Sequence, residues 1–177
     1  HLARLQNDTL PIKDFLSSLS ERLVRVPGTA IFLHGSSGGV PLALLHNIKH
    51  NKVLHERVVL LTVIVDDVTF VPTEWRIESK AMDHGFHQVL LHYGFMQDPD
   101  VPKALAQAKQ EELGFFYEPM SISYFLSRET IIPQGKSDLP IWQAYIYANL
   151  SRMAASAMDF FRLPINRVFE LGGQVEI

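Results

Sequence analysis

A glycine- and serine-rich pentapeptide offers the first candidate chemistry in this sequence. Residues 35–39 match the G-x-S-x-G pattern of a nucleophile elbow, in which a turn between a strand and a helix exposes a serine hydroxyl, here that of Ser37. The other members of a catalytic triad would follow in the order acid and then histidine. The available side chains are Asp66, Asp67, His84, His87 and His92. Because the chain contains eight histidines, this order is easily met by chance. We therefore favour a turn in which glycine supplies an unusual φ and serine caps the next helix.

The same pentapeptide could instead bind an anion. Backbone N–H groups at the start of a helix point outward, and the helix dipole favours a negative charge there. The segment lacks the lysine and Ser/Thr of a P-loop, and it is not G-x-G-x-x-G. The predicted ligand is an adenine nucleotide that acts as a regulator. The candidate ligand-binding residues are Gly35, Ser36, Ser37, Gly38 and Gly39.

A pair of histidines one helical turn apart raises the question of a metal site. His46 and His50 could face one ion, but Asn47 stands where an HExxH motif has glutamate. No further carboxylate has the usual spacing. We therefore predict no metal site, and we expect both histidines to hydrogen-bond to neighbours or to help cap the helix end.

The elements that would position these residues alternate between strands and helices. Strands are predicted at 29–34 and 58–66, and the helix over 41–51 between them implies that they pair in parallel. Segments 75–80 and 86–93 are joined by a short turn and are predicted to be antiparallel neighbours. The remaining predicted elements are helices over 12–23, 101–113 and 141–160, a strand over 121–126 and an edge strand over 169–177. Residues 26–28 are expected to end the first helix, and 133–140 are expected to form a loop.

These elements predict an α/β fold, a three-layer Rossmann-like domain whose mixed, mainly parallel sheet is flanked by helices. Within 177 residues we expect a lead-in over 1–25, with an amphipathic helix, and a single domain over 26–177. A net charge of −3 gives no reason to expect a nucleic-acid partner. The longest apolar run, 58–65, is too short to cross a membrane. The absence of cysteine excludes disulfides, and the absence of an initiator methionine suggests a piece of a longer protein.

Long blocks of this sequence resemble one family. The blocks are similar to the C-terminal cytosolic domain of the KUP (KUP/HAK/KT) potassium uptake transporters. They are residues 26–33, 44–63, 93–96 with Pro99 and 101–102, 124–129 and 163–177. The sequence departs from the family pattern at 34–39, 68–74 and 133–140. The resemblance implies a proton-coupled potassium symporter whose membrane helices precede residue 1. It assigns no potassium or proton pathway residue to this chain.

The resemblance suggests a regulatory or assembly domain on the cytoplasmic side of the inner or plasma membrane, without catalysis of its own. The expected partners are its own transmembrane domain and a second copy, because the family tends to pair through its cytosolic part and the aromatic-rich segment 141–160 could supply an apolar contact. No cofactor is expected apart from the regulatory nucleotide. The alternatives are a nucleotide-binding sensor that uses residues 35–39 and a small serine hydrolase that uses Ser37.

Overall fold

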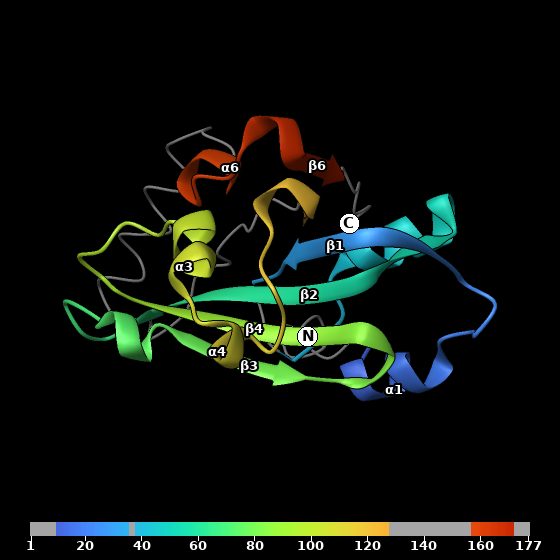
Figure 1. Cartoon of the computed structure of the whole chain (residues 1–177), viewed down its shortest axis with the longest axis horizontal. Helices are drawn as coiled ribbons and strands as arrows, with labels where there is room; N and C mark the ends of the chain where they lie inside the picture. Colours follow the sequence, from blue (N-terminus) through green and yellow to red (C-terminus); the bar gives the residue numbers. More distant parts are fainter. Residues whose placement is uncertain (1–9, 36–37, 128–156, 172–177) are drawn as a thin grey trace, which may run out of the picture.

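A six-stranded sheet forms the centre of the part of the chain that the computed structural model describes, residues 10–35, 38–127 and 157–171. The strands are β1 (Val24–Leu33), β2 (Val53–Asp66), β3 (Ile77–Ala81), β4 (Phe86–Gly94), β5 (Ile122–Ser127) and β6 (Val168–Leu171). Their order across the sheet is β3-β4-β2-β1-β5-β6 (Figure 1). All neighbours are parallel except β3 and β4, which are antiparallel. Both the mixed, mainly parallel sheet and its antiparallel pair are therefore confirmed.

Helices cover both faces of the sheet and confirm the predicted three layers. The helices are α1 (Ile12–Ser18), α2 (Leu42–His46) with a π-helical continuation over Asn47–Asn51, α3 (Val101–Gln107), α4 (Gln110–Leu113) and α6 (Ala157–Phe160). Buried residues of α1 and α2 form one hydrophobic cluster with the sheet. Buried residues of α3 and α4 form a second cluster on the other face.

Strand β1 shows why the predicted strands carry apolar runs. Ala30 and Phe32 belong to the cluster with α1 and α2, whereas Ile31 and Leu33 belong to the cluster with α3 and α4. Successive side chains of a strand point to opposite faces, so a strand covered on both sides needs apolar residues at every position. The run of apolar residues in β1 follows directly from this packing.

The start of β1 corrects the prediction that residues 26–28 end a helix. Helix α1 already ends at Ser18, and β1 begins at Val24. Pro27 and Gly28 lie inside the strand, where the register with β2 shifts between Val26 and Thr29. Gly28 has a φ of 103°, a conformation that favours glycine. The Pro-Gly pair therefore forms an irregularity within the strand and does not terminate it.

The helix predicted over 101–113 is two shorter helices. Asp100 caps α3, because its Oδ1 accepts from the backbone N–H of Lys103 at 3.0 Å. Ala108 is extended and ends α3. A new helix, α4, starts after Lys109, whose backbone N–H donates to Glu112 Oε2 at 3.1 Å. This second cap lets the chain change direction between the two helices.

Some predicted elements lie largely outside the described residues. The predicted loop over 133–140 lies outside the described residues, and so does most of the predicted helix over 141–160. Of that helix, the structure describes α6. Strand β6 confirms the start of the predicted edge strand, while 172–177 are not described. Within the described ranges, the helices are all too short or too polar to span a bilayer.

Candidate functional site

The glycine-rich turn lies after β1, where it was predicted. Gly35 and Gly38 are exposed and Gly39 is buried, whereas Ser36 and Ser37 lie outside the described residues. A Cβ built on Gly38 would have no atom within 4 Å, and the φ of Gly38 is one that other residues adopt. The turn is therefore open at Gly38. The prediction that residues 35–39 bind a ligand stays a prediction.

The start of α2 contradicts the predicted serine cap. The N-cap residue of α2 is Pro41, and it makes no side-chain capping hydrogen bond. Next to it, Gly39 forms an isolated antiparallel bridge with Pro11, and the Val40 N–H donates to the Leu10 carbonyl at 3.2 Å. The second half of the turn is thus fastened to the segment that precedes α1, and the helix begins without help from a serine.

The position of this turn in the sheet is the one at which α/β proteins bind ligands. β1 lies between β2 and β5. The chain passes from β1 to β2 on one side, whereas β5 and β6 extend the sheet on the other side, so the strand order reverses at β1. The crevice beyond the carboxyl ends of the strands at such a reversal is the usual ligand site of open α/β sheets. Gly35 follows the carboxyl end of β1, and Ser127 ends β5 beside it.

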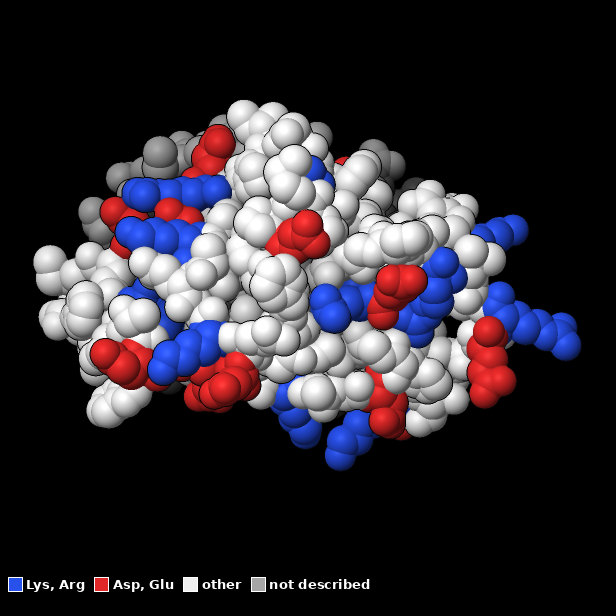
Figure 2. All heavy atoms as spheres, in the orientation of Figure 1, with Lys and Arg blue, Asp and Glu red and all other residues white. Residues whose placement is uncertain are grey.

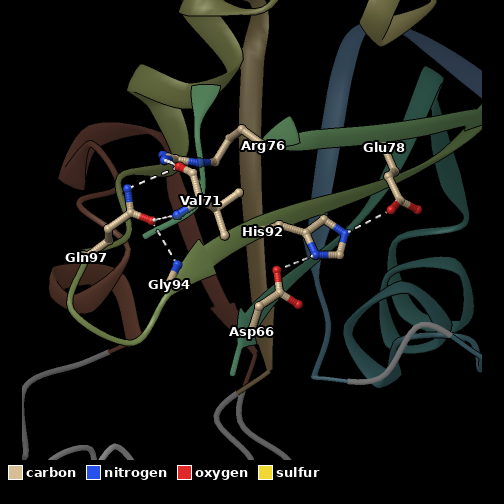
Figure 3. A network of polar contacts seen from close by, with 7 residues as sticks. All are labelled: Asp66, Val71, Arg76, Glu78, His92, Gly94 and Gln97. Carbon is tan, nitrogen blue, oxygen red and sulfur yellow. Dashed lines mark hydrogen bonds and ion pairs between the residues drawn. The ribbon is translucent and has the colours of Figure 1, made fainter. Parts of the chain in front are cut away.

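A contact between an acid and a histidine exists, but its geometry differs from that of a triad. His92 Nδ1 lies 2.9 Å from Asp66 Oδ2, and His92 Nε2 lies 3.2 Å from Glu78 Oε1 (Figure 3). In a triad the second nitrogen faces the nucleophile, whereas here it faces a carboxylate. The arrangement joins β2, β4 and β3, and the sequence reasoning did not find Glu78.

The two other candidate histidines have structural surroundings. His84 lies in the β3–β4 turn, and its carbonyl accepts from Arg25 at 2.9 Å. The His87 ring packs edge-on against Phe115, with ring centroids 5.0 Å apart. Among the contacts of the described residues, neither histidine reaches Asp66. Of the alternatives for the acid and the histidine, the contacts of the described residues therefore bring together Asp66 and His92, and Ser37 lies outside those residues.

The histidine pair of the α2 region stacks. The ring centroids of His46 and His50 are 5.7 Å apart, and the ring planes are inclined by 28°. Buried Asn47 between them donates to the Val53 carbonyl at 3.1 Å and accepts from Asn51 at 2.8 Å, so it ties the end of the helix to β2. In the ranges that the structure covers, no group of three or more potential metal ligands comes together.

A polar network fastens the β2–β3 loop to the end of β4. Gln97 Oε1 accepts from the N–H groups of Val71 and Gly94 at 2.9 and 2.8 Å (Figure 3). The Val71 carbonyl accepts from Arg76 at 2.8 Å and from Gln97 at 3.3 Å. The Arg76 guanidinium lies over the Tyr93 ring, 4.1 Å from its centroid. This network gives the loop a fixed backbone, and sequence reasoning missed it.

The fastened segments carry exposed apolar side chains at one end of the molecule. β2 and β4 run on past the last β1–β2 pair, Leu33–Leu61, to the pair Asp66–Gly94, so the loop projects from the sheet. We call its exposed large apolar residues the apolar tip: Val68 (47% exposed), Phe70 (61%), Trp75 (75%), Phe95 (39%) and Met96 (76%). In Figure 2 the outermost left edge of the molecule, where Figure 1 places this loop, is white.

Two half-buried histidines predict how stability depends on pH. Burial lowers the pKa of His55 below 6.5, and it lowers the pKa of His87 with a contribution from the Arg57 charge. The folded state therefore binds fewer protons than the unfolded chain as the pH falls toward and below 6.5, and the free energy of unfolding falls with it. We expect the melting temperature to drop between pH 7 and 5. This drop should be smaller in His55→Phe and in His87→Phe than in the wild type. If both variants showed a drop as large as that of the wild type, the two histidines would not cause the pH dependence.

The comparisons with known proteins decide the family. A family model described as "K+ potassium transporter C-terminal domain" matches residues 27–177. The chain belongs to this family. It is 62% identical over 176 residues to a probable potassium transport system protein Kup 2 from Paramagnetospirillum magneticum, covering 99% of the chain and 27% of the relative. A probable Kup protein from Erythrobacter litoralis is 49% identical over 174 residues, covering 98% of the chain and 28% of the relative.

The chain thus spans little more than a quarter of the length of these potassium transport relatives. No solved structure matches the chain. Within this potassium transporter C-terminal domain, the segment Tyr93–Met96, one of the blocks that carry the resemblance, contains the end of β4 and lies against the loop. A Cβ on Gly94 would lie 2.4 Å from backbone atoms of Thr69 and Phe70, so the close approach requires glycine.

Proposed function

We propose that this chain is the cytosolic regulatory and assembly domain of a proton-coupled potassium uptake symporter. The observation that carries the proposal is the match of residues 27–177 to a potassium transporter C-terminal domain, together with relatives more than three times longer than the chain. In this proposal, the absent part of the transporter lies in the membrane and moves the ion. The domain acts without catalysis, metal or ion pathway of its own.

The physical basis of regulation is a difference in docking between transport states. A domain shifts a conformational equilibrium only if its contacts with the two states differ in free energy. The described sheet has helices and hydrophobic clusters on both faces, so the domain can move and dock as one packed body. We further propose that it pairs with a second copy, which would link two transporters through their cytosolic parts.

The test compares potassium uptake by the full-length transporter with uptake by a version that lacks residues 1–177. Both are produced in cells without other potassium uptake systems and are matched for the amount of protein in the membrane. We expect uptake that is slower, or that no longer responds to potassium supply, without the domain. Equal rates and equal responses would show that the domain has no regulatory role.

A second candidate function is adenine nucleotide sensing, and the place of the 35–39 turn at the strand reversal favours it. A ligand that binds only the folded state raises the melting temperature as its concentration exceeds Kd. We expect ATP, ADP or AMP to stabilise the wild type and Gly38→Ala, but not Gly38→Asp, whose carboxylate repels phosphate. A flat response of the wild type to all three nucleotides would remove this candidate.

A further inference from the structure

The apolar tip concentrates exposed hydrophobic surface on a rigid support. Its five exposed large hydrophobic side chains come from two short segments of the described residues, 68–75 and 95–96. An apolar patch on a folded domain indicates a contact surface more often than single scattered residues do. In Figure 2 the outermost left edge of the molecule, where Figure 1 places this loop, is white, and side chains of both charges lie beside it.

The support holds the tip in place before any partner arrives. The Phe95 N–H donates to the Val68 carbonyl at 2.9 Å, and the Met96 N–H donates to the Thr69 carbonyl at 3.3 Å. Gln97 and Arg76 fix Val71 in the same loop. A preorganised surface loses little conformational entropy on binding, so its apolar area can contribute efficiently to affinity. The loop is therefore built to present its side chains outward.

The charges around the tip distinguish between partners. Segments 66–76 and 94–98 contain four carboxylates, those of Asp66, Asp67, Glu74 and Asp98, and one cation, Arg76. The Arg76 guanidinium is already held by the Val71 carbonyl and the Tyr93 ring. Anionic lipid headgroups would be repelled by this excess of negative charge, whereas lysine and arginine side chains would be attracted.

We propose that the apolar tip docks on a lysine- and arginine-bearing loop of the membrane-embedded part of its own transporter. The proposal rests on the proposed function and names the surface that the domain would use. More than two thirds of the relatives' length lies outside this chain. In the proposed transporter, the membrane-embedded part is covalently attached to the domain and is therefore present at high effective concentration. Cytoplasmic loops of membrane proteins are enriched in lysine and arginine, which complements the carboxylates around the tip.

Photo-crosslinking in the full-length transporter tests the surface and its occupant together. Trp75 is replaced by p-benzoylphenylalanine, with Phe116 as the matched control, since it is exposed but lies outside the tip. After irradiation in membranes, mass spectrometry identifies the crosslinked peptide. We expect crosslinks from position 75 to a lysine- or arginine-bearing loop of the transport part. Crosslinks to lipid, to another copy of this domain, or none above the Phe116 control would overturn the proposal.

Paired variants test the apolar and the charged contributions separately. Phe70→Ser with Met96→Ser, and Asp67→Asn with Glu74→Gln, should each lower the crosslinking yield at position 75 several-fold. The exposed Glu111→Gln should leave it unchanged. All replaced side chains are exposed, so melting temperatures should stay close to wild type. Unchanged yields in both double variants would contradict the proposal.

The deletion experiment keeps the two proposals distinguishable. If uptake changes when residues 1–177 are removed but the crosslinks go elsewhere, the regulatory function stands and the tip is not its docking surface. If the crosslinks reach a basic loop but uptake does not change, the docking is real and the regulatory function is wrong.

Discussion

Phe32→Ala should lower the free energy of unfolding by about 3–5 kcal/mol, the usual cost of emptying a buried aromatic site. Phe32 is fully buried in the central strand β1, and its ring stacks on Phe125 with centroids 4.6 Å apart. Phe125 stacks in turn on Phe169 of β6. The cavity would thus weaken the packing that links β1, β5 and β6. Chemical denaturation followed by circular dichroism measures the loss.

The matched control for Phe32→Ala is Val24→Ala in the same strand. Val24 is exposed, so its truncation should change the free energy of unfolding by less than about 0.5 kcal/mol. For a domain of this size, each kcal/mol corresponds to about 2–4 °C in melting temperature. A loss for Phe32→Ala as small as that of the control would show that the stacked phenylalanines do not form part of the core.

Gly94→Ala is expected to release the β2–β3 loop from the end of β4. Its Cβ would lie 2.4 Å from backbone atoms of Thr69 and Phe70, and backbone atoms cannot yield as a flexible side chain does. We expect a loss of about 1–3 kcal/mol, as for other overpacked sites. Hydrogen exchange should accelerate at the N–H groups of Val71, Phe95 and Met96, which donate across this junction.

Gly38→Ala provides the control, because a Cβ at Gly38 meets no atom within 4 Å. Its exchange rates and melting temperature should match those of the wild type. If Gly94→Ala left exchange at Phe95 and Met96 unchanged, the close approach of the loop to β4 would not exist in solution. The crosslinking yield from position 75 should also fall in Gly94→Ala, since the apolar tip would lose its support.

The sheet was predictable because its strands are buried on both faces and carry apolar runs that stand out in the sequence. The start of β1 was not predictable in the same way, since Pro27 and Gly28 have the local pattern of a chain break. Their irregularity is set by neighbouring strands: a Cβ on Gly28 would lie 2.9 Å from the Ser121 carbonyl oxygen of the segment before β5. Such a constraint comes from residues distant in sequence.

The candidate site was predictable only in part, for a similar reason. The pairing of Asp66 with His92 lay within the set of residues considered, because both fit the order of acid and then histidine that a triad requires. Glu78 was missed because its contact depends on the antiparallel register, in which Glu78 pairs with Leu90, two residues before His92. The loop over 67–76 has no strand or helix periodicity, and its anchor Gln97 lies 26 residues beyond Val71.

Strand β3 limits aggregation between copies of the domain through the edge of the sheet. It lies at the outer edge of the sheet, where unpaired backbone groups invite strand addition and aggregation. Exposed Glu78 and Lys80 place opposite charges along this short strand, and Ser79 donates to the Leu113 carbonyl of α4 at 2.6 Å. Charged, short border strands are a common natural defence against uncontrolled fibre growth. Even at high local concentration, copies of the domain would therefore not join through this strand into open-ended polymers.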